Sequence, residues 1–313
     1  MHPDLVSVLR CPVCGDALTL TGRTAYCPQR HAFDLAKQGY LNLLPSASTG
    51  IEGDSAEMVD ARDQFLAGTF YAPVRQALIA AAAELEPSGA RTSTAATGAA
   101  VEGRARGAAA DGKLVVEVGA GTGYYLAGVV EAQAGRRGLA LDVSRYAARR
   151  AAKVDPERIG AVVCDAWQEL PVRDQAAHLV LNVFAPRNAT EMARILAPGG
   201  SLLVVTPNQA HLAELVGVLG LVRVDEEKER RLSESLGGSF EKLGSEVVEV
   251  AMRLDHPAVE LLVAMTPSAR HTDKVELAER IAVLADPTPV TLSVTLSVWQ
   301  SAGSSTAPAE DSD

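Results

Sequence analysis

Four residues near the start of the chain have the spacing C-x2-C-x12-C-x3-H, which constrains the fold more than any other feature of the sequence. They are Cys11, Cys14, Cys27 and His31. Two thiolates two residues apart hold a metal ion from a tight turn, and a third thiolate with an imidazole completes a tetrahedron around zinc. Because four protein ligands leave no open coordination position, we predict one structural Zn2+ in a small domain that depends on it to fold.

Two other interpretations of these cysteines exist. They are either unrelated core residues beside a surface histidine, or partners in disulfides. The spacing favours a metal site over the first interpretation. Disulfides are disfavoured because no secretory signal precedes the cysteines, and because a chain of 313 residues with 47% hydrophobic residues is long enough to fold without them.

Composition and charge limit the partners of the chain. No apolar run approaches the roughly 20 residues that span a bilayer, so we expect a cytoplasmic protein with no membrane partner. The net charge of −10 does not favour nucleic acid, whose phosphates attract Lys and Arg. Residues 1–45, however, hold four basic and three acidic side chains, so this segment remains able to contact a phosphate backbone.

Composition and periodicity divide the chain into five segments. They are a zinc-binding domain (1–45), a helical connector (46–85), a flexible insertion rich in Ala, Gly, Ser and Thr (86–112), a large α/β domain (113–300) and a disordered tail (301–313). In the connector, Ser55 is a predicted helix N-cap, and the helical pattern continues past Pro73.

Short apolar runs alternate with helical or turn segments through the large domain. The predicted strands are 114–118, 138–143, 161–164, 179–184, 201–205, 247–254 and 290–298. This alternation implies right-handed crossovers and a parallel sheet with helices on both faces. We therefore predict an α/β fold with a seven-stranded Rossmann-like sheet.

A glycine-rich turn after the first of these strands, together with an acidic residue at the end of the second, carries another chemical signal. The residues are Glu117, Gly119, Gly121, Thr122, Gly123 and Asp142. Such a turn lets the backbone approach a ligand at a helix N-terminus, and Asp142 is placed to accept hydrogen bonds from ribose hydroxyls. In a dinucleotide fingerprint the third glycine follows the second by three positions, whereas here it follows by two. Glu117 would also repel a pyrophosphate but attract the cationic end of S-adenosyl-L-methionine, so the pattern favours a methyltransferase over a dehydrogenase.

Four short motifs extend this interpretation. They are C-P-V-C (11–14), C-P-Q-R-H-A-F-D (27–34), G-Y-L-N-L-L-P (39–45) and G-D-S-A-E-M (53–58). Together they resemble the bacterial 23S rRNA guanine-N1 methyltransferases of the RlmA type, and the resemblance runs from about Leu9 to Gln300. It implies a zinc domain that helps to recognise RNA and a class I methyltransferase domain that uses S-adenosyl-L-methionine.

The family has two branches, which modify nucleotides 745 and 748 in a 23S rRNA hairpin of domain II that lines the peptide exit tunnel. The second branch includes a tylosin-resistance enzyme. The Ala-rich composition resembles that of high-GC actinobacterial chains and favours the 748 branch. A homodimer would let two zinc domains form one RNA cleft.

The resemblance also implies site residues. The glycine loop, Asp142, Tyr71 and His211 are expected to contact the methyl donor, so the connector contributes to the cofactor site. Otherwise Tyr71 is a helix-core aromatic and His211 a surface residue at a helix start. Asp165, after Cys164 at the end of the third strand, lies where adenine is expected, although Cys164 also fits a small buried hydrophobe.

The sequence assigns no catalytic base. N1 of guanine carries a proton that must leave during methylation, and Asp165 and Glu169 are candidates by location alone, with helix caps or surface carboxylates as the alternative. Phe184 and Arg187 follow the fourth strand, where we predict that they stack on the target guanine and contact a phosphate. Residues 182–186 lack the paired prolines and following aromatic that mark methylation of an exocyclic amine, so a ring nitrogen is the more natural acceptor.

Three classes of function remain open at this point. The first is an RNA methyltransferase of the 748 or the 745 type, with macrolide resistance as a possible consequence. The second is a small-molecule methyltransferase whose zinc domain closes over the donor. The third is a zinc-containing RNA-binding protein without chemistry, which the intact glycine loop and Asp142 disfavour.

Overall fold

A computed structural model describes residues 1–45, 52–85, 114–221, 228–266 and 273–302. The insertion predicted at 86–112 lies outside these residues, as does the predicted tail beyond residue 302.

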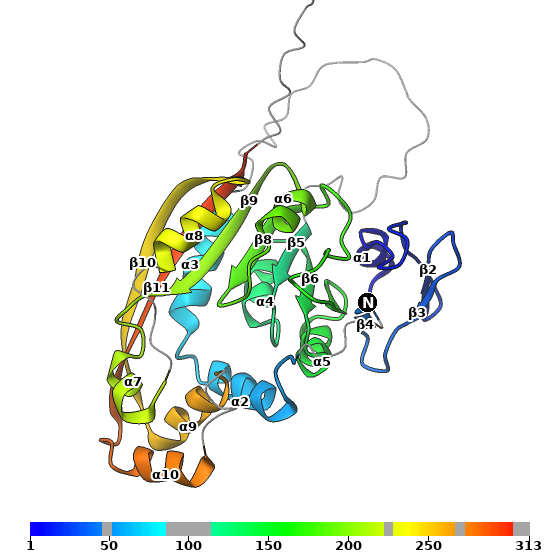
Figure 1. The fold of residues 1–313 in the computed structure, drawn as a ribbon. Helices are drawn as coiled ribbons and strands as arrows, with labels where there is room; N and C mark the ends of the chain where they lie inside the picture. Colours follow the sequence, from blue (N-terminus) through cyan, green and yellow to red (C-terminus); the bar gives the residue numbers. More distant parts are fainter. Residues whose placement is uncertain (46–51, 86–113, 222–227, 267–272, 303–313) are drawn as a thin grey trace, which may run out of the picture.

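An eight-stranded sheet with the order β10-β11-β9-β8-β5-β6-β7-β4 forms the centre of the molecule (Figure 1). Its strands are β4 (Leu41–Asn42), β5 (Leu114–Val118), β6 (Arg137–Asp142), β7 (Ile159–Val163), β8 (Ala177–Val183), β9 (Leu196–Pro207), β10 (Phe240–Leu254) and β11 (Thr288–Ser301). All seven strands predicted for the large domain are present, and the predicted Rossmann-like α/β fold is confirmed.

The sheet is mixed, because one strand, β11, departs from the parallel arrangement that the alternation of strands and helices predicts. The pairings among strands β4 to β9 are all parallel. Strand β11 is antiparallel to both of its neighbours, β9 and β10. The chain leaves β10 at Leu254 and re-enters β11 at Thr288, and these two residues are register partners. Since the connection leaves β10 and enters β11 at the same end of the two strands, β11 must run antiparallel to β10.

The eighth strand, β4, was not predicted as part of this sheet. Leu41 and Asn42 pair in parallel with Val162 and Val163 of β7, and the Leu43 amide donates to the Val163 carbonyl at 2.9 Å. A strand of two residues has no alternating pattern to detect, so its place follows only from the long-range contact.

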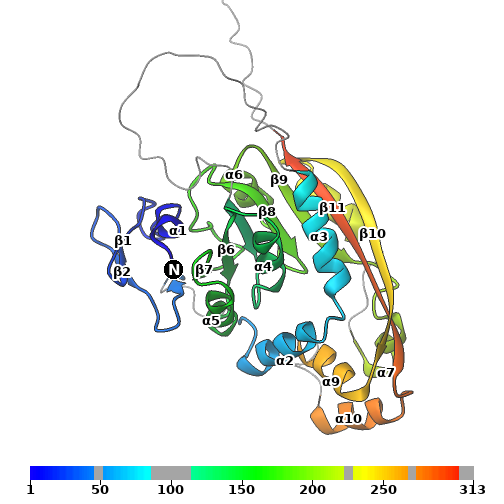
Figure 2. The same cartoon turned by 180° about the vertical axis from the view of Figure 1, so that it is seen from behind.

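Helices cover both faces of the sheet. They are α2 (Ala56–Ala67), α3 (Ala72–Glu84), α4 (Tyr124–Glu131), α5 (Arg145–Val154), α6 (Ala189–Ile195), α7 (Ala213–Leu219), α8 (Lys228–Leu236), α9 (His256–Ala264) and α10 (Lys274–Ala282). Alternation along β5 sends Leu114 and Val116 into one apolar cluster with α6 and α8, and Val115 into another with α3, α4 and α5. Figure 2 shows α3 and α4 on the latter face.

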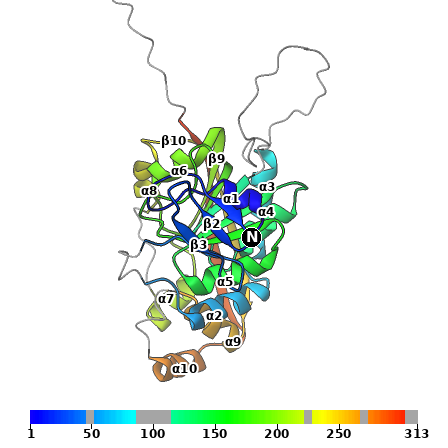
Figure 3. The ribbon, with the colours of Figure 1, turned by 90° about the vertical axis from the view of Figure 1, so that its right-hand side faces the viewer.

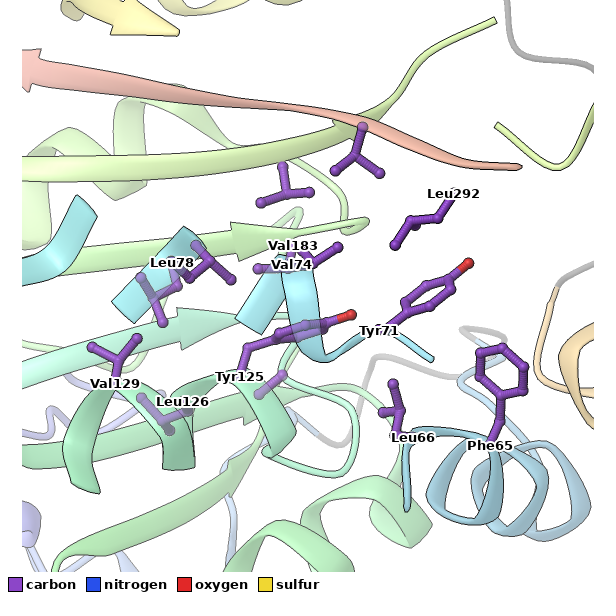
Figure 4. Close-up of a cluster of buried hydrophobic side chains, with 14 of the residues drawn as sticks. Phe65, Leu66, Tyr71, Val74, Leu78, Tyr125, Leu126, Val129, Val183 and Leu292 are labelled. Carbon is purple, nitrogen blue, oxygen red and sulfur yellow. The ribbon is translucent and has the colours of Figure 1, made fainter. Parts of the chain in front are cut away.

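The second cluster packs α2 and α3 against α4 and the ends of the strands (Figure 4). Ser55 caps α2 as predicted, because its hydroxyl accepts the Met58 amide at 3.3 Å. Pro73 lies in the first turn of α3, where its missing N–H removes no helical hydrogen bond. Figure 1 places α2, α9 and α10 at the end of the sheet where β8 and β9 terminate.

The N-terminal residues form a small zinc module of helix α1 (Pro3–Ser7) and a three-stranded sheet of β1 (Thr19–Thr21), β2 (Thr24–Tyr26) and β3 (Ala32–Asp34). In Figure 3, where this side of the molecule faces the viewer, the module lies in front of the main sheet. Leu9 forms a β-bridge with Val172, and the Arg10 amide donates to the Pro171 carbonyl at 3.1 Å. Cys11 and Cys27 belong to the same apolar cluster as the face of the main sheet, so the module shares a continuous core with it.

Among the described helices, none has both the length and the apolar composition needed to cross a membrane.

Candidate functional site

The four predicted metal ligands lie together in the zinc module, with their ligand atoms all within 4.8 Å of one another. The Nδ1 atom of His31 is 3.5 Å from the Cys11 Sγ and 3.3 Å from the Cys27 Sγ, and the Sγ atoms of Cys14 and Cys27 are 3.6 Å apart. A disulfide would require about 2.05 Å between the sulfurs, so the disulfide interpretation is wrong.

The distances fit a zinc ion. Zinc bound by thiolates at about 2.3 Å and by nitrogen at about 2.0 Å sets tetrahedral ligand-to-ligand distances of about 3.5 to 3.8 Å. The backbone also fits, because the Val13 amide lies 3.5 Å from the Cys11 Sγ and the Gly15 amide donates to the Cys11 carbonyl at 2.9 Å. Gly15, with φ of 78°, turns the chain back after the first ligand pair.

The glycine loop after β5 adopts the conformation that its sequence predicts. Gly119, Gly121 and Gly123 all have φ between 53° and 80°, in the left-handed region that favours glycine. A Cβ atom on Gly119 would lie 2.4 Å from the Cβ of Ala185, so only glycine lets β5 and the loop after β8 approach this closely. Thr122, between the last two glycines, is buried.

Asp142 at the end of β6 fixes the position of this loop. One carboxylate oxygen accepts the Gly121 amide and the other accepts the Ser144 amide, each at 2.8 Å. Burial raises the pKa of Asp142, while these two N–H groups oppose that rise. Each oxygen keeps a second lone pair, so the carboxylate remains able to accept from ribose hydroxyls.

Glu117 lies behind the loop and is 1% exposed. Its carboxyl oxygen accepts the Leu126 amide of α4 at 3.0 Å and so joins β5 to the helix that follows the loop. Burial, with the nearby Asp142 carboxylate, raises the pKa of Glu117 to about 8. The hydrogen bond from the Leu126 amide acts in the opposite direction. The attraction of Glu117 for a cationic donor remains a prediction.

Tyr71, Phe184 and His211 come from three distant parts of the chain and form one aromatic wall. The Tyr71 Oη is 3.3 Å from the His211 Nε2, and Phe184 stacks on the His211 ring with centroids 6.0 Å apart. Tyr71 is buried against Phe65 in the core as well, so it is both a core aromatic and a member of this wall (Figure 4). Phe184 is 40% exposed. Its φ of 53°, in the left-handed region, was not predicted from the sequence.

The structure gives both candidate bases other partners. Asp165 is buried and accepts the Trp167 amide at 2.9 Å, as a turn-stabilising aspartate does. Glu169 is paired with Arg10 of the zinc module at 2.7 Å. Cys164 is buried, which raises the pKa of its thiol, and Arg187 is half-buried beyond Phe184.

Arg62 of α2 was missed by the sequence analysis. Its side chain lies over Gly121, since a Cβ on that glycine would be 3.4 Å from the Arg62 Cδ. The Ser144 hydroxyl donates to the Asp54 carbonyl at 2.7 Å and holds the start of this segment against the loop. The 53–58 motif was the only signal that α2 has a role here, because Arg62 itself looks like an ordinary polar helix residue.

A parallel Rossmann-like sheet with a glycine turn after its central strand and an acidic residue after the next, joined to a Cys3His zinc module, defines a zinc-containing class I methyltransferase. Residues 9–48 match the family described as "RlmA, N-terminal", and residues 116–204 match the family described as "Methyltransferase domain". The chain belongs to the family of 23S rRNA (guanine-N1)-methyltransferases, as its similarity to two full-length relatives shows.

One relative is the 23S rRNA (guanine(748)-N(1))-methyltransferase of Streptomyces fradiae, 46% identical over 298 residues that cover 95% of this chain and 98% of that protein. The other is a protein of Micromonospora griseorubida, provisionally designated a 23S rRNA (guanine-N(1)-)-methyltransferase, 46% identical over 96% of this chain and 99% of its own length. Among solved structures, the MccD protein has a TM-score of 0.42 at 14% identity, over 60% of this chain and 90% of its own. That last similarity is too low to indicate function.

Replacing one metal ligand should release the zinc. Cys14→Ser removes a thiolate that is exposed, so the substitution opens no cavity. We expect about one zinc per wild-type chain by elemental analysis and at least about a tenfold loss of zinc retention in the variant against a chelator. Cys164→Ser, which changes the cysteine outside the cluster, should keep its zinc. A full equivalent of zinc in Cys14→Ser would contradict the ligand set.

Stability should fall with pH because of Glu117. A carboxyl whose pKa is higher in the folded than in the unfolded chain stabilises the fold below its ordinary pKa near 4.5, and this contribution is lost as the pH rises toward 8. Glu117→Gln removes the ionisation. Between pH 5 and 8, without donor, we expect the wild-type Tm to fall at least about 2 °C more than that of the variant.

The matched control for this measurement is Glu131→Gln, because the Glu131 side chain is 71% exposed. This variant should follow the wild-type pH profile. Parallel curves for the wild type and Glu117→Gln would show that Glu117 is ionised throughout and would refute the raised pKa.

Proposed function

We propose that the protein methylates N1 of guanine 748 in 23S rRNA, in the domain II hairpin of the peptide exit tunnel, with S-adenosyl-L-methionine as donor. The observation that carries this proposal is the 46% identity, over nearly the whole of both chains, to the Streptomyces fradiae enzyme with that printed activity. The reaction takes place in the cytoplasm, where ribosomal RNA is found, and protects the ribosome against macrolides of the tylosin type.

The donor site lies at the carboxyl ends of β5, β6 and β7, where parallel sheets of this kind bind ligands. The glycine loop accommodates the donor's close approach, Asp142 binds the ribose, and the loop around Asp165 holds the adenine. Tyr71 and His211 lie beside the methionine end. When bound, the donor would supply an electrophilic methyl group on a sulfonium. A bond from guanine N1 to the methyl carbon would form as the carbon–sulfur bond breaks, so that S-adenosyl-L-homocysteine leaves and N1 gives up its proton.

The acceptor site lies at the exit of β8. The chain's role there is to hold the guanine ring within attacking distance, since a target base must leave its stack to be reached. Phe184 presents an exposed ring at this point, and its left-handed backbone is fixed by the hydrogen bond from its amide to the Val205 carbonyl at 3.2 Å. Arg187 follows on the same loop and contacts the RNA backbone.

The zinc module contributes the RNA surface away from the reacting base. Its attachment to β7 and to the loop that holds Asp165 makes it a fixed wall rather than a tethered domain. Exposed Arg30, held at φ of 65° between the third and fourth ligands, offers a guanidinium to phosphate. In a homodimer, two such modules would line one cleft for the hairpin.

Methylation at N1 blocks Watson–Crick pairing, so reverse transcriptase stops beside the modified base. Primer extension on 23S rRNA should show a stop directly before guanine 748, on its 3′ side, in cells that express the protein, and none in cells that carry Asp142→Ala, which loses the ribose contact. A stop displaced by three nucleotides would identify guanine 745 and refute the proposed position. No stop at either guanine, together with labelling of a metabolite extract, would favour the small-molecule alternative.

Phe184→Ala should lower the turnover of rRNA while leaving donor binding intact. Stacking of one base on an aromatic side chain stabilises a complex by about 1 to 3 kcal/mol, so we expect kcat/KM for RNA to fall about 10- to 100-fold. Donor affinity, measured by calorimetry, should change less than about threefold. Phe184→Tyr keeps a ring and should keep activity; equal loss in both variants, or no loss in Phe184→Ala, would exclude the stacking role.

A further inference from the structure

Arg62 projects from α2 onto the middle of the glycine loop. Measured from the position of a Cβ built on Gly121, its Cδ, Nη1 and Nε atoms lie at 3.4, 3.7 and 3.9 Å. The three atoms nearest to that position all belong to Arg62, so its guanidinium and the stem of its side chain cover this glycine.

The hydrogen bonds from Arg62 to Asp54 and Met265 both use one terminal nitrogen and leave its buried Nε–H without an acceptor in the described part of the chain. Nη2 donates to the Asp54 carboxylate at 2.5 Å and to the Met265 carbonyl at 2.9 Å, which fixes the guanidinium plane. Nε is buried and has no partner among the described residues. A buried N–H of a charged group that stays unpaired destabilises a fold, so such a group beside the glycine loop points to an acceptor on a ligand.

The surroundings of Arg62 select the kind of acceptor. Arg62 covers Gly121, whose amide donates to Asp142. Its positive charge acts to lower the pKa of both Asp142 and Tyr71, so the guanidinium lies close to both groups. In the proposed donor site, S-adenosyl-L-methionine spans the interval between these groups, from its ribose to its methionine end. Of its charged groups, the sulfonium and the α-ammonium are cationic, and only the α-carboxylate complements a guanidinium.

We propose that Arg62 binds the α-carboxylate of S-adenosyl-L-methionine through its Nε–H. Asp54 and the Met265 carbonyl hold the guanidinium in place through Nη2, which leaves the Nε–H for the ligand. Fixing the carboxylate anchors the methionine end of the donor, and the ribose is anchored at Asp142. The two anchors together determine where the methyl group points. This inference rests on the use of S-adenosyl-L-methionine that the proposed function also requires.

The test compares two ligands that differ in one group. Calorimetry without RNA measures the Kd of S-adenosyl-L-methionine and of its decarboxylated analogue for each variant. We expect the wild type to bind the intact donor at least about tenfold more tightly, and Arg62→Met to reduce this preference to less than about threefold, mainly by weakening the intact donor about 10- to 100-fold. The wild-type preference is informative even if Arg62→Met fails to fold.

The matched control is Arg150→Met. Arg150 of α5 also holds α2 in place, through ion pairs with Asp60 and Asp63. These ion pairs involve carboxylates of α2 and do not cover the glycine loop. This variant should keep the wild-type preference for the carboxylate.

Three outcomes would overturn the assignment. Equal weakening of both ligands in Arg62→Met would make Arg62 a purely structural tie, and equal wild-type affinity for both would show that no group reads the carboxylate. Loss of rRNA affinity with unchanged donor binding would assign Arg62 to a phosphate of the RNA instead. A wild-type protein that binds neither ligand would refute the proposed function itself, which is distinguishable from the other results.

Discussion

The carboxylate of Asp142 is the point on which the donor site depends. It accepts one backbone N–H from the glycine loop and one from Ser144 at the start of α5, so a single side chain aligns two loops at neighbouring strand ends. Ser144 in turn donates to the Asp54 carbonyl, and Asp54 accepts from Arg62. The helical connector is therefore positioned, through Ser144, by the carboxylate that also fixes the glycine loop. Disturbing Asp142 would displace the loop and the connector together.

The zinc module depends on a different constraint, the pairing of β4 with β7. This pairing places the end of the metal-binding segment in the main sheet, and Cys11 and Cys27 share an apolar cluster with core residues of that sheet. A zinc ion bound there would consequently stabilise more than its own ligands. It would hold the surface of the module at a fixed position relative to the main sheet.

Features that depend on local chemistry could be predicted from the sequence. The ligand set around Cys11, the Ser55 cap and the glycine loop all follow from spacing and residue type, and the structure contains each of them. Features that depend on long-range contacts could not. The pairing of Leu41 has too few residues to leave a pattern, and the antiparallel course of β11 depends on where the chain re-enters the sheet. Arg62 was missed for the same reason, since its importance comes only from Gly121, 59 residues away in the sequence.

The hydrogen bonds of the aromatic wall restrict how guanine N1 loses its proton. The Ser293 main-chain N–H only donates, at 3.3 Å to the His211 Nδ1, so the neutral imidazole carries its proton on Nε2 and donates it to the Tyr71 Oη. His211 thus has no free lone pair toward the acceptor site. Burial raises the pKa of Tyr71, which keeps the hydroxyl protonated and unable to act as a base. Asp165 and Glu169 are engaged by the Trp167 amide and by Arg10. Neither His211 nor Tyr71 therefore offers a basic lone pair, and the contribution expected of this wall is to position the reactants rather than to remove the proton.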